Sequence, residues 1–71
     1  MTSNPLEPMQ GIAEHVRAAR DQHGWTQAEL ADQAGLSRPT IARIERGDDV
    51  STTTLAKVAA TLGLTLTVLP E

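Results

Sequence analysis

The stretch from residue 27 to residue 46 decides the fold: Gln27-Ala-Glu-Leu-Ala-Asp-Gln-Ala-Gly-Leu-Ser-Arg-Pro-Thr-Ile-Ala-Arg-Ile-Glu-Arg46. At its start, Thr26 and Glu29 have the spacing of a capping box, in which each side chain accepts a hydrogen bond from the other residue's backbone amide. Gly35 can adopt the left-handed conformation that ends a helix, and Ser37 can cap the next one. The stretch therefore predicts two short helices joined by a tight turn.

These two helices have the residues that a helix-turn-helix requires. Such a unit needs a small residue where its helices cross, a glycine in the turn and apolar side chains on the facing surfaces. Ala31 is the small residue and Gly35 is the turn glycine. The apolar positions are filled by Leu30, Ala34, Leu36, Ile41 and Ile44. We therefore expect a helix-turn-helix between residues 27 and 46.

The face of the second helix opposite Ile41 and Ile44 is the expected binding surface. Short side chains allow a helix to lie deep in the major groove of DNA, and arginine can bind O6 and N7 of guanine together. A merely solvated face is the alternative, and it is weaker because the arginines coincide with the outer side of the motif. This outward face holds Pro39, Ala42, Arg43 and Arg46, with Arg38 on its flank.

Two more helices and a strand complete the expected fold, which is mainly α-helical with four helices. The first helix is predicted to begin near Pro8 or Met9 and to end before Gly24, and the last to end at Gly63. Residues 64–69 alternate apolar residues with threonine, which is typical of a strand. The predicted organisation is a flexible arm (residues 1–8), a helix-turn-helix DNA-binding domain (residues 9–63) and a dimerisation strand (residues 64–71).

The composition excludes several classes of protein. With 71 residues and no cysteine, the chain makes one small domain, or part of one, without disulfides or thiolate metal sites. No apolar run approaches the ~20 residues of a membrane-spanning helix, and the first residues lack the pattern of a signal peptide. His15 and His23 lack converging ligands for a metal, and no activated nucleophile is present. We expect a cytoplasmic protein that is not an enzyme and has no cofactor, metal or membrane.

The charge is unevenly distributed along the chain. The net charge is −3, which by itself argues against unspecific affinity for nucleic acid. However, three of the six Lys and Arg residues lie between Ser37 and Gly47, where only one acid is present. The positive charge is thus concentrated on the expected recognition helix.

The C-terminal alternation predicts a homodimer. A single strand leaves its backbone groups unpaired and its apolar side chains exposed, so it is not expected to be ordered alone. The same strand of a second copy can pair with it across a two-fold axis. Such a dimer would place two recognition helices on a palindromic site with half-sites ~34 Å apart. The residues expected to rest on the helices and support the dimer are Leu64, Leu66 and Val68.

Residues 11 to 63 resemble the Xre/lambda-repressor-like family of DNA-binding domains. The resemblance implies that Gln27, at the start of the helix before the turn, binds a phosphate and supports the recognition helix after it. It implies that this recognition helix reads DNA bases through Arg38, Pro39, Ala42 and Arg43. It also implies that Arg20 pairs with Glu45 and lies near a phosphate. Free amides at the start of the recognition helix can add to these contacts. The predicted phosphate contacts are Arg20, Gln27, Ser37, Thr40 and Arg46.

The residues after Gly63 point to one group within this family. Where the wider family continues into a further helix after the position of Gly63, this chain is predicted to enter a strand. Together with Gly24-Trp25-Thr26-Gln27, this is similar to the HipB-type antitoxins. The resemblance implies a repressor that binds double-stranded operator DNA as a dimer, whose C-terminal strands pair in a two-stranded intersubunit sheet. It also implies a HipA-like serine/threonine kinase as the toxin partner. A stand-alone Xre-type regulator and a protein-interaction module are the alternatives.

Overall fold

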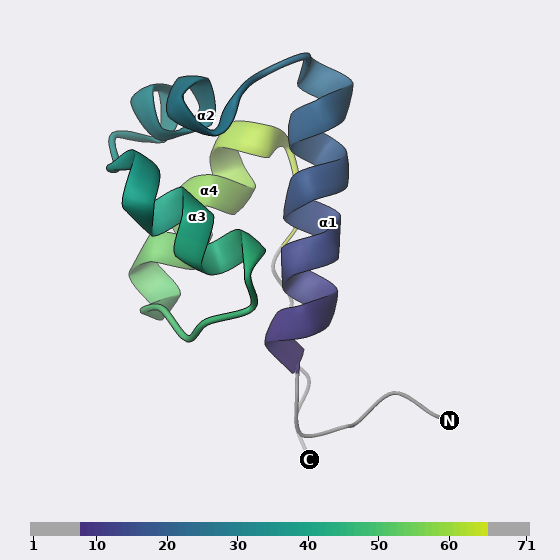
Figure 1. Cartoon of the computed structure of the whole chain (residues 1–71), viewed down its shortest axis with the longest axis vertical. Helices are drawn as coiled ribbons and strands as arrows, with labels where there is room; N and C mark the ends of the chain where they lie inside the picture. The colour runs from purple at the N-terminus through teal and green to yellow at the C-terminus, as the bar shows by residue number, and fades with distance from the viewer. Residues whose placement is uncertain (1–7, 66–71) are drawn as a thin grey trace.

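The computed structural model describes residues 8 to 65, and this part of the chain folds into four helices. Figure 1 shows α2, α3 and α4 gathered along one side of the longer α1. The four predicted helices are therefore confirmed. Their bounds are Pro8–His23 for α1, Gln27–Ala34 for α2, Arg38–Glu45 for α3 and Thr52–Leu62 for α4.

The predicted capping box and turn join α2 to its neighbours. The Thr26 hydroxyl accepts a hydrogen bond from the Glu29 amide at 3.0 Å, and the Glu29 carboxylate accepts one from the Thr26 amide at 2.8 Å. Gly35 ends α2 in the left-handed conformation, with φ 70° and ψ 34°. Ser37 then caps α3 by accepting a hydrogen bond from the Thr40 amide at 3.3 Å. These local signals fix the short connection between α2 and α3.

Gly47 stops α3 in the same way as Gly35 stops α2. The helix ends at Glu45, with Arg46 as its right-handed cap, and Gly47 follows with a φ of 87°. A Cβ at Gly47 would collide with the side-chain amide of Gln10. The glycine is therefore required by its left-handed backbone conformation, because the flexible Gln10 side chain can move aside.

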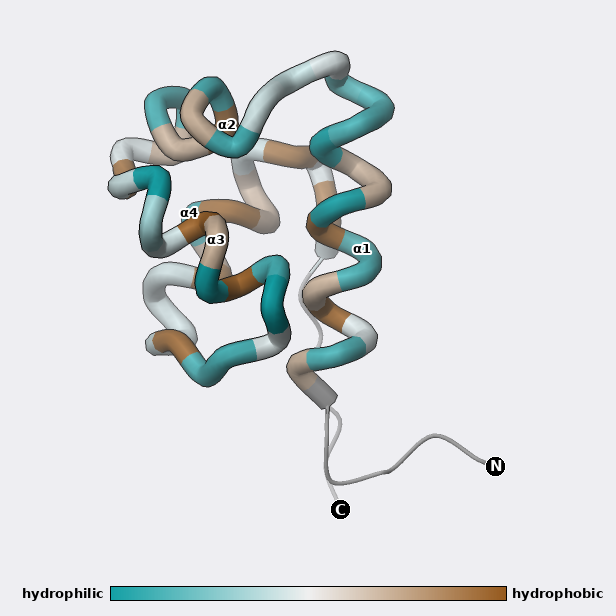
Figure 2. Tube along the Cα trace, viewed as in Figure 1, coloured by the Kyte–Doolittle hydropathy of each residue, from teal (hydrophilic) through white to brown (hydrophobic). Residues whose placement is uncertain are grey.

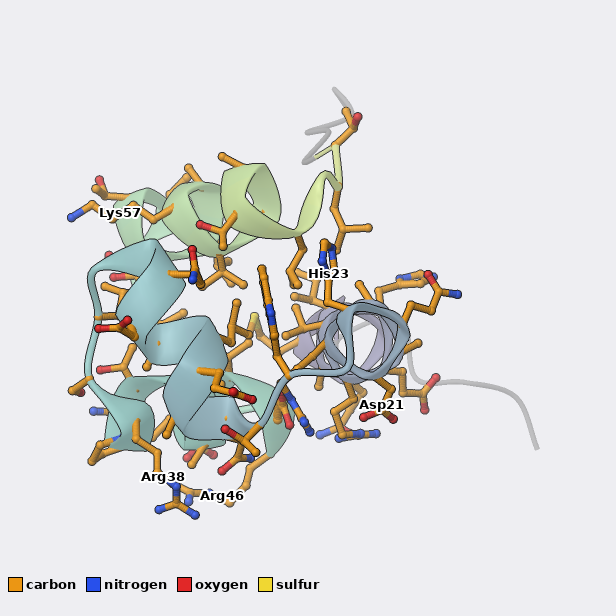
Figure 3. The ribbon with its side chains drawn as sticks, turned by 90° about the horizontal axis from the view of Figure 1, so that it is seen from above. Asp21, His23, Arg38, Arg46 and Lys57 are labelled. Atoms are coloured by element: carbon orange, nitrogen blue, oxygen red, sulfur yellow. The ribbon has the colours of Figure 1, made fainter. Side chains whose placement is uncertain are left out.

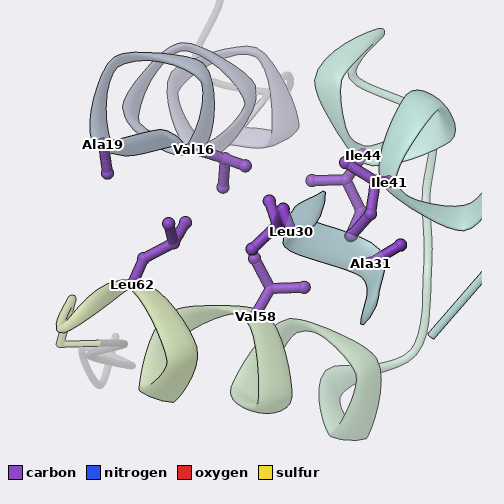
Figure 4. Packing of buried hydrophobic residues seen from close by; sticks show 8 residues of the cluster. All are labelled: Val16, Ala19, Leu30, Ala31, Ile41, Ile44, Val58 and Leu62. Atoms are coloured by element: carbon purple, nitrogen blue, oxygen red, sulfur yellow. The ribbon is translucent and has the colours of Figure 1, made fainter. Parts of the chain in front are cut away.

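One apolar core joins all four helices. Leu30, Ile41, Ile44 and Val58 are fully buried, and Figure 4 shows side chains of α1 and α4 pointing toward Leu30 from opposite sides. In Figure 2 the hydrophilic residues of α1 follow its outer side. Because the core contains few large side chains, partly buried residues at its edge complete it: Ile12, Trp25, Leu36, Val50, Leu55 and Leu64.

The two predicted terminal segments are only partly within the described residues. Leu64 and Thr65 follow α4 without regular secondary structure, and Leu64 packs against the core as expected for a residue that rests on the helices. Leu66 and Val68, with the rest of the predicted strand, lie outside the described residues, as does nearly all of the predicted arm. Among residues 8–65, no helix is long and apolar enough to cross a membrane.

Candidate nucleic-acid interface

The outer face of α3 carries exposed arginines on either side of two small residues, Pro39 and Ala42. Arg38, Arg43 and Arg46 are exposed, as is Pro39, while Ala42 is half-buried. Ile41 and Ile44 are buried on the opposite side and thereby fix the rotation of the helix. Figure 3 shows Arg38 and Arg46 on one side of the molecule, with Lys57 of α4 extending from the opposite side. The arrangement suits insertion of α3 into a groove of DNA.

The charges on this face are largely available. Arg46 forms an ion pair with Asp48 at 2.9 Å, and both side chains are exposed. Such surface pairs contribute little, so a phosphate can compete for Arg46. Within residues 8–65, Arg38 and Arg43 form no ion pair. At the start of the helix, the hydroxyls of Ser37 and Thr40 lie 2.9 Å apart and share a hydrogen bond.

Behind α3 lies a polar cluster around the buried Glu45, which we call the Glu45 cluster: Arg17, Arg20, Gln27 and Glu45. Glu45 is only 5% exposed. Its carboxylate accepts hydrogen bonds from Arg20 Nε at 2.7 Å and Nη2 at 3.0 Å, and from Gln27 Nε2 at 3.1 Å. Arg20 Nη1 donates to the Trp25 carbonyl at 2.8 Å, and Arg17 donates to the backbone carbonyl of Glu45. The cluster thus ties α1 and α2 to the end of α3.

The Glu45 carboxyl is charged in this setting. Burial disfavours the charged form, but hydrogen bonds from Arg20 and Gln27 and the positive charges of Arg20 and Arg17 outweigh it. The pKa of Glu45 is therefore lowered from its ordinary value. The ion pair with Arg20, predicted from the family resemblance, is present in a bidentate form.

The structure places the predicted phosphate contacts in two groups. Ser37, Thr40 and Arg46 lie on α3 or at its ends, while Arg20 and Gln27 meet at Glu45. Gln27 is half-buried and donates one amide hydrogen to Glu45. Within residues 8–65, its second amide hydrogen and its carbonyl oxygen remain for other partners. All six Lys and Arg residues of the chain lie within the described part.

Sequence reasoning missed three contacts. The bonds from Gln27 and Arg17 to Glu45 join residues 18 and 28 positions apart, and no local pattern announces them. The rings of His23 and Trp25 stack with their centroids 4.3 Å apart. In the part of the chain that the structure describes, no group of three potential metal ligands is present.

A capped turn between two short helices, with an exposed basic face on the second, defines a helix-turn-helix domain. The family described as Helix-turn-helix (HTH_3) matches residues 16–69. The protein belongs to this family.

Similar proteins include antitoxins and transcription factors. Antitoxin HipB of Escherichia coli (strain K12) is 39% identical over 57 residues, which cover 79% of this chain and 65% of that protein. The chain thus spans slightly less than two thirds of the length of this relative. A solved structure described as "Structure of HipA-HipB-O2-O3 complex" has a TM-score of 0.74 and 31% identity, covering 99% of this chain and 93% of the other. A hypothetical transcription factor from Neisseria has a TM-score of 0.78 and 30% identity, covering 92% and 74%.

Proposed function

We propose that the protein is a repressor that binds double-stranded operator DNA as a homodimer, with α3 in the major groove. The single observation that carries the proposal is the exposed arginine face of α3, held by a buried apolar side and the Glu45 cluster. The protein acts by occupying its site, without a chemical step, a metal or a cofactor. Binding of this kind requires access to DNA, which fits a cytoplasmic location.

Two kinds of contact divide the work of binding. Arginine side chains that reach base edges give sequence preference, and contacts to phosphates give affinity that falls with salt. Arg38 and Arg43, with Pro39 and Ala42 between them, are assigned to the bases. Phosphates are assigned to Arg20, Gln27, Ser37, Thr40 and Arg46.

Replacing Arg43 by alanine tests the base assignment. We expect Arg43→Ala to weaken binding to the preferred duplex by ~1–3 kcal/mol and to relax preference at one base pair. Gln27→Ala is expected to weaken binding to every duplex by about the same factor, because it removes a contact to the DNA phosphates and none to the bases. Fluorescence anisotropy with duplexes that differ at single base pairs measures both effects.

Lys57→Ala is the matched control, since it removes one exposed positive charge from the side opposite Arg38 and Arg46 (Figure 3). Its affinity and its base preference should equal those of the unchanged protein. If Arg43→Ala behaved like this control, α3 would not be the helix that reads the bases.

We further propose that the protein is the antitoxin of a HipBA-type pair and neutralises a HipA-like serine/threonine kinase. The proposal is supported by the likeness to Antitoxin HipB over 79% of this chain and to a chain of the HipA-HipB-O2-O3 complex over 99% of it. The antitoxin proposal also agrees with the strand predicted after Gly63, because the wider family continues into a further helix at that point. A stand-alone Xre-type regulator is the second candidate, favoured by the likeness to the Neisseria transcription factor.

Co-expression distinguishes these two candidates. If the protein is an antitoxin, it should relieve the growth arrest caused by the kinase encoded next to it, and the two proteins should purify together. Binding to DNA without binding to any HipA-like kinase of the same genome would leave the stand-alone regulator. A protein-interaction module would bind its partner yet show no salt-dependent affinity for duplex DNA.

A further inference from the structure

A cation on α1 lies at the C-terminal end of the recognition helix. Arg17 Nη1 donates a hydrogen bond to the backbone carbonyl of Glu45, the last residue of α3. The next residue along the chain is Arg46, which caps α3 and is exposed. The side chain of Arg17 is itself exposed. Arg17 therefore brings a positive charge from α1 to the edge of the face formed by α3.

Arg20 and Arg17 differ in how much of their charge and how many of their N–H donors remain free for DNA. Arg20 is 16% exposed and uses its Nε, Nη1 and Nη2 atoms on Glu45 and Trp25. Its charge is balanced by the buried carboxylate of Glu45. Arg17, in contrast, forms no ion pair within residues 8–65. A guanidinium has five N–H donors, so Arg17 keeps four after its bond to the carbonyl.

We propose that Arg17 contacts a DNA phosphate beside the C-terminal end of α3, as a binding residue that the sequence did not indicate. The inference rests on the proposed DNA binding and adds α1 to the binding surface. The Glu45 carbonyl holds the guanidinium at the helix end, and its planar fork suits the oxygens of a phosphate. Glu45 thus holds three side chains beside α3: Arg20 and Gln27 through its carboxylate and Arg17 through its backbone carbonyl.

A purely structural role is the competing explanation. A cation near a helix C-terminus is favourable because it lies near the negative end of the helix dipole. That role affects the melting temperature of the free protein, but it does not change how binding to DNA depends on salt. Each phosphate contact, in contrast, contributes about 0.9 to the slope of log K against log salt concentration. The salt slope therefore separates the two roles.

The test compares Arg17→Gln with the unchanged protein by titrating a fluorescent duplex at several salt concentrations. We expect the slope to fall by about 0.9 per protomer, and the affinity at about 0.1 M salt to fall about eightfold per protomer. The same factor is expected for the preferred duplex and for one of unrelated sequence. Arg17→Lys should keep the slope, since it retains the charge.

Lys57→Gln is the matched control, with the same change in charge on the opposite side of the molecule, and it should leave the slope unchanged. A wild-type slope in Arg17→Gln would overturn the inference, whether or not the melting temperature changes. In that case DNA binding by α3 would stand, because the unchanged protein still binds. Absence of binding by the unchanged protein would overturn the proposed function together with this inference.

Discussion

We expect Glu45→Ala to lower the free energy of unfolding by about 3 kcal/mol. The cost arises because the substitution removes the carboxylate that pairs with Arg20. Arg20 would keep its positive charge in a setting where its side chain is only 16% exposed, without the carboxylate that accepts two of its hydrogen bonds. Gln27 would lose its acceptor as well. Urea or thermal unfolding followed by circular dichroism measures the change.

A double-mutant cycle shows whether the effect comes from the pair. Because Arg20 would then have only the exposed Asp21, at 3.6 Å, as an ionic partner, Glu45→Ala alone should destabilise the protein more than Arg20→Ala and Glu45→Ala together. Asp48→Ala is the control, because it breaks an exposed pair with Arg46 and should cost less than about 1 kcal/mol. Additive effects of the Arg20 and Glu45 substitutions would show that the two residues are not coupled.

The same carboxylate makes stability depend on pH. Because the pKa of Glu45 is lower in the folded protein, its contribution is fully present above the ordinary glutamate pKa of about 4.3. The contribution is lost as the pH falls through the lower value of the folded state. The difference in stability between the unchanged protein and Glu45→Gln should therefore shrink below about pH 4.3.

Deleting residues 64–71 is expected to weaken binding to a two-half-site operator by about 10²- to 10⁴-fold, because a monomer loses the gain of binding two half-sites together. The deletion removes Leu64, which packs against the core, so we also expect lower stability. Sedimentation measures the oligomeric state, and anisotropy with one-site and two-site duplexes measures the loss.

Removing only Pro70 and Glu71 is the control, because these residues follow the alternating stretch. This variant should remain a dimer with full affinity. A full-length protein that sediments as a monomer at micromolar concentration would contradict the dimer, and with it the operator with two half-sites.

The local features of this fold could be predicted because each depends on neighbours in sequence. Thr26 and Glu29 form their capping box within one helical turn, and Gly35 ends α2 by its own conformational freedom. The inward positions of Ile41 and Ile44 follow from the helical period, and this in turn places the arginines outside. For these reasons the four helices and the exposed face of α3 agree with the sequence.

The contacts behind that face could not be derived from the same patterns. Glu45 is charged and was linked to Arg20 only by family resemblance, since burial of a carboxylate depends on which helices meet around it. The bonds from Gln27 and Arg17 depend on the packing angles of α1 and α2 against α3.

Selection of bound duplexes from a random library tests the central claim most directly, because it works without a known operator sequence. For the full-length protein we predict enrichment of one palindromic sequence whose half-sites lie ~34 Å apart, about one turn of the double helix. Affinity for the selected duplex should fall steeply with salt, and Arg43→Ala should relax the preference at one position of each half-site. Recovery of random sequence, with no salt-dependent binding, would contradict the assignment of α3 as a DNA-recognition helix.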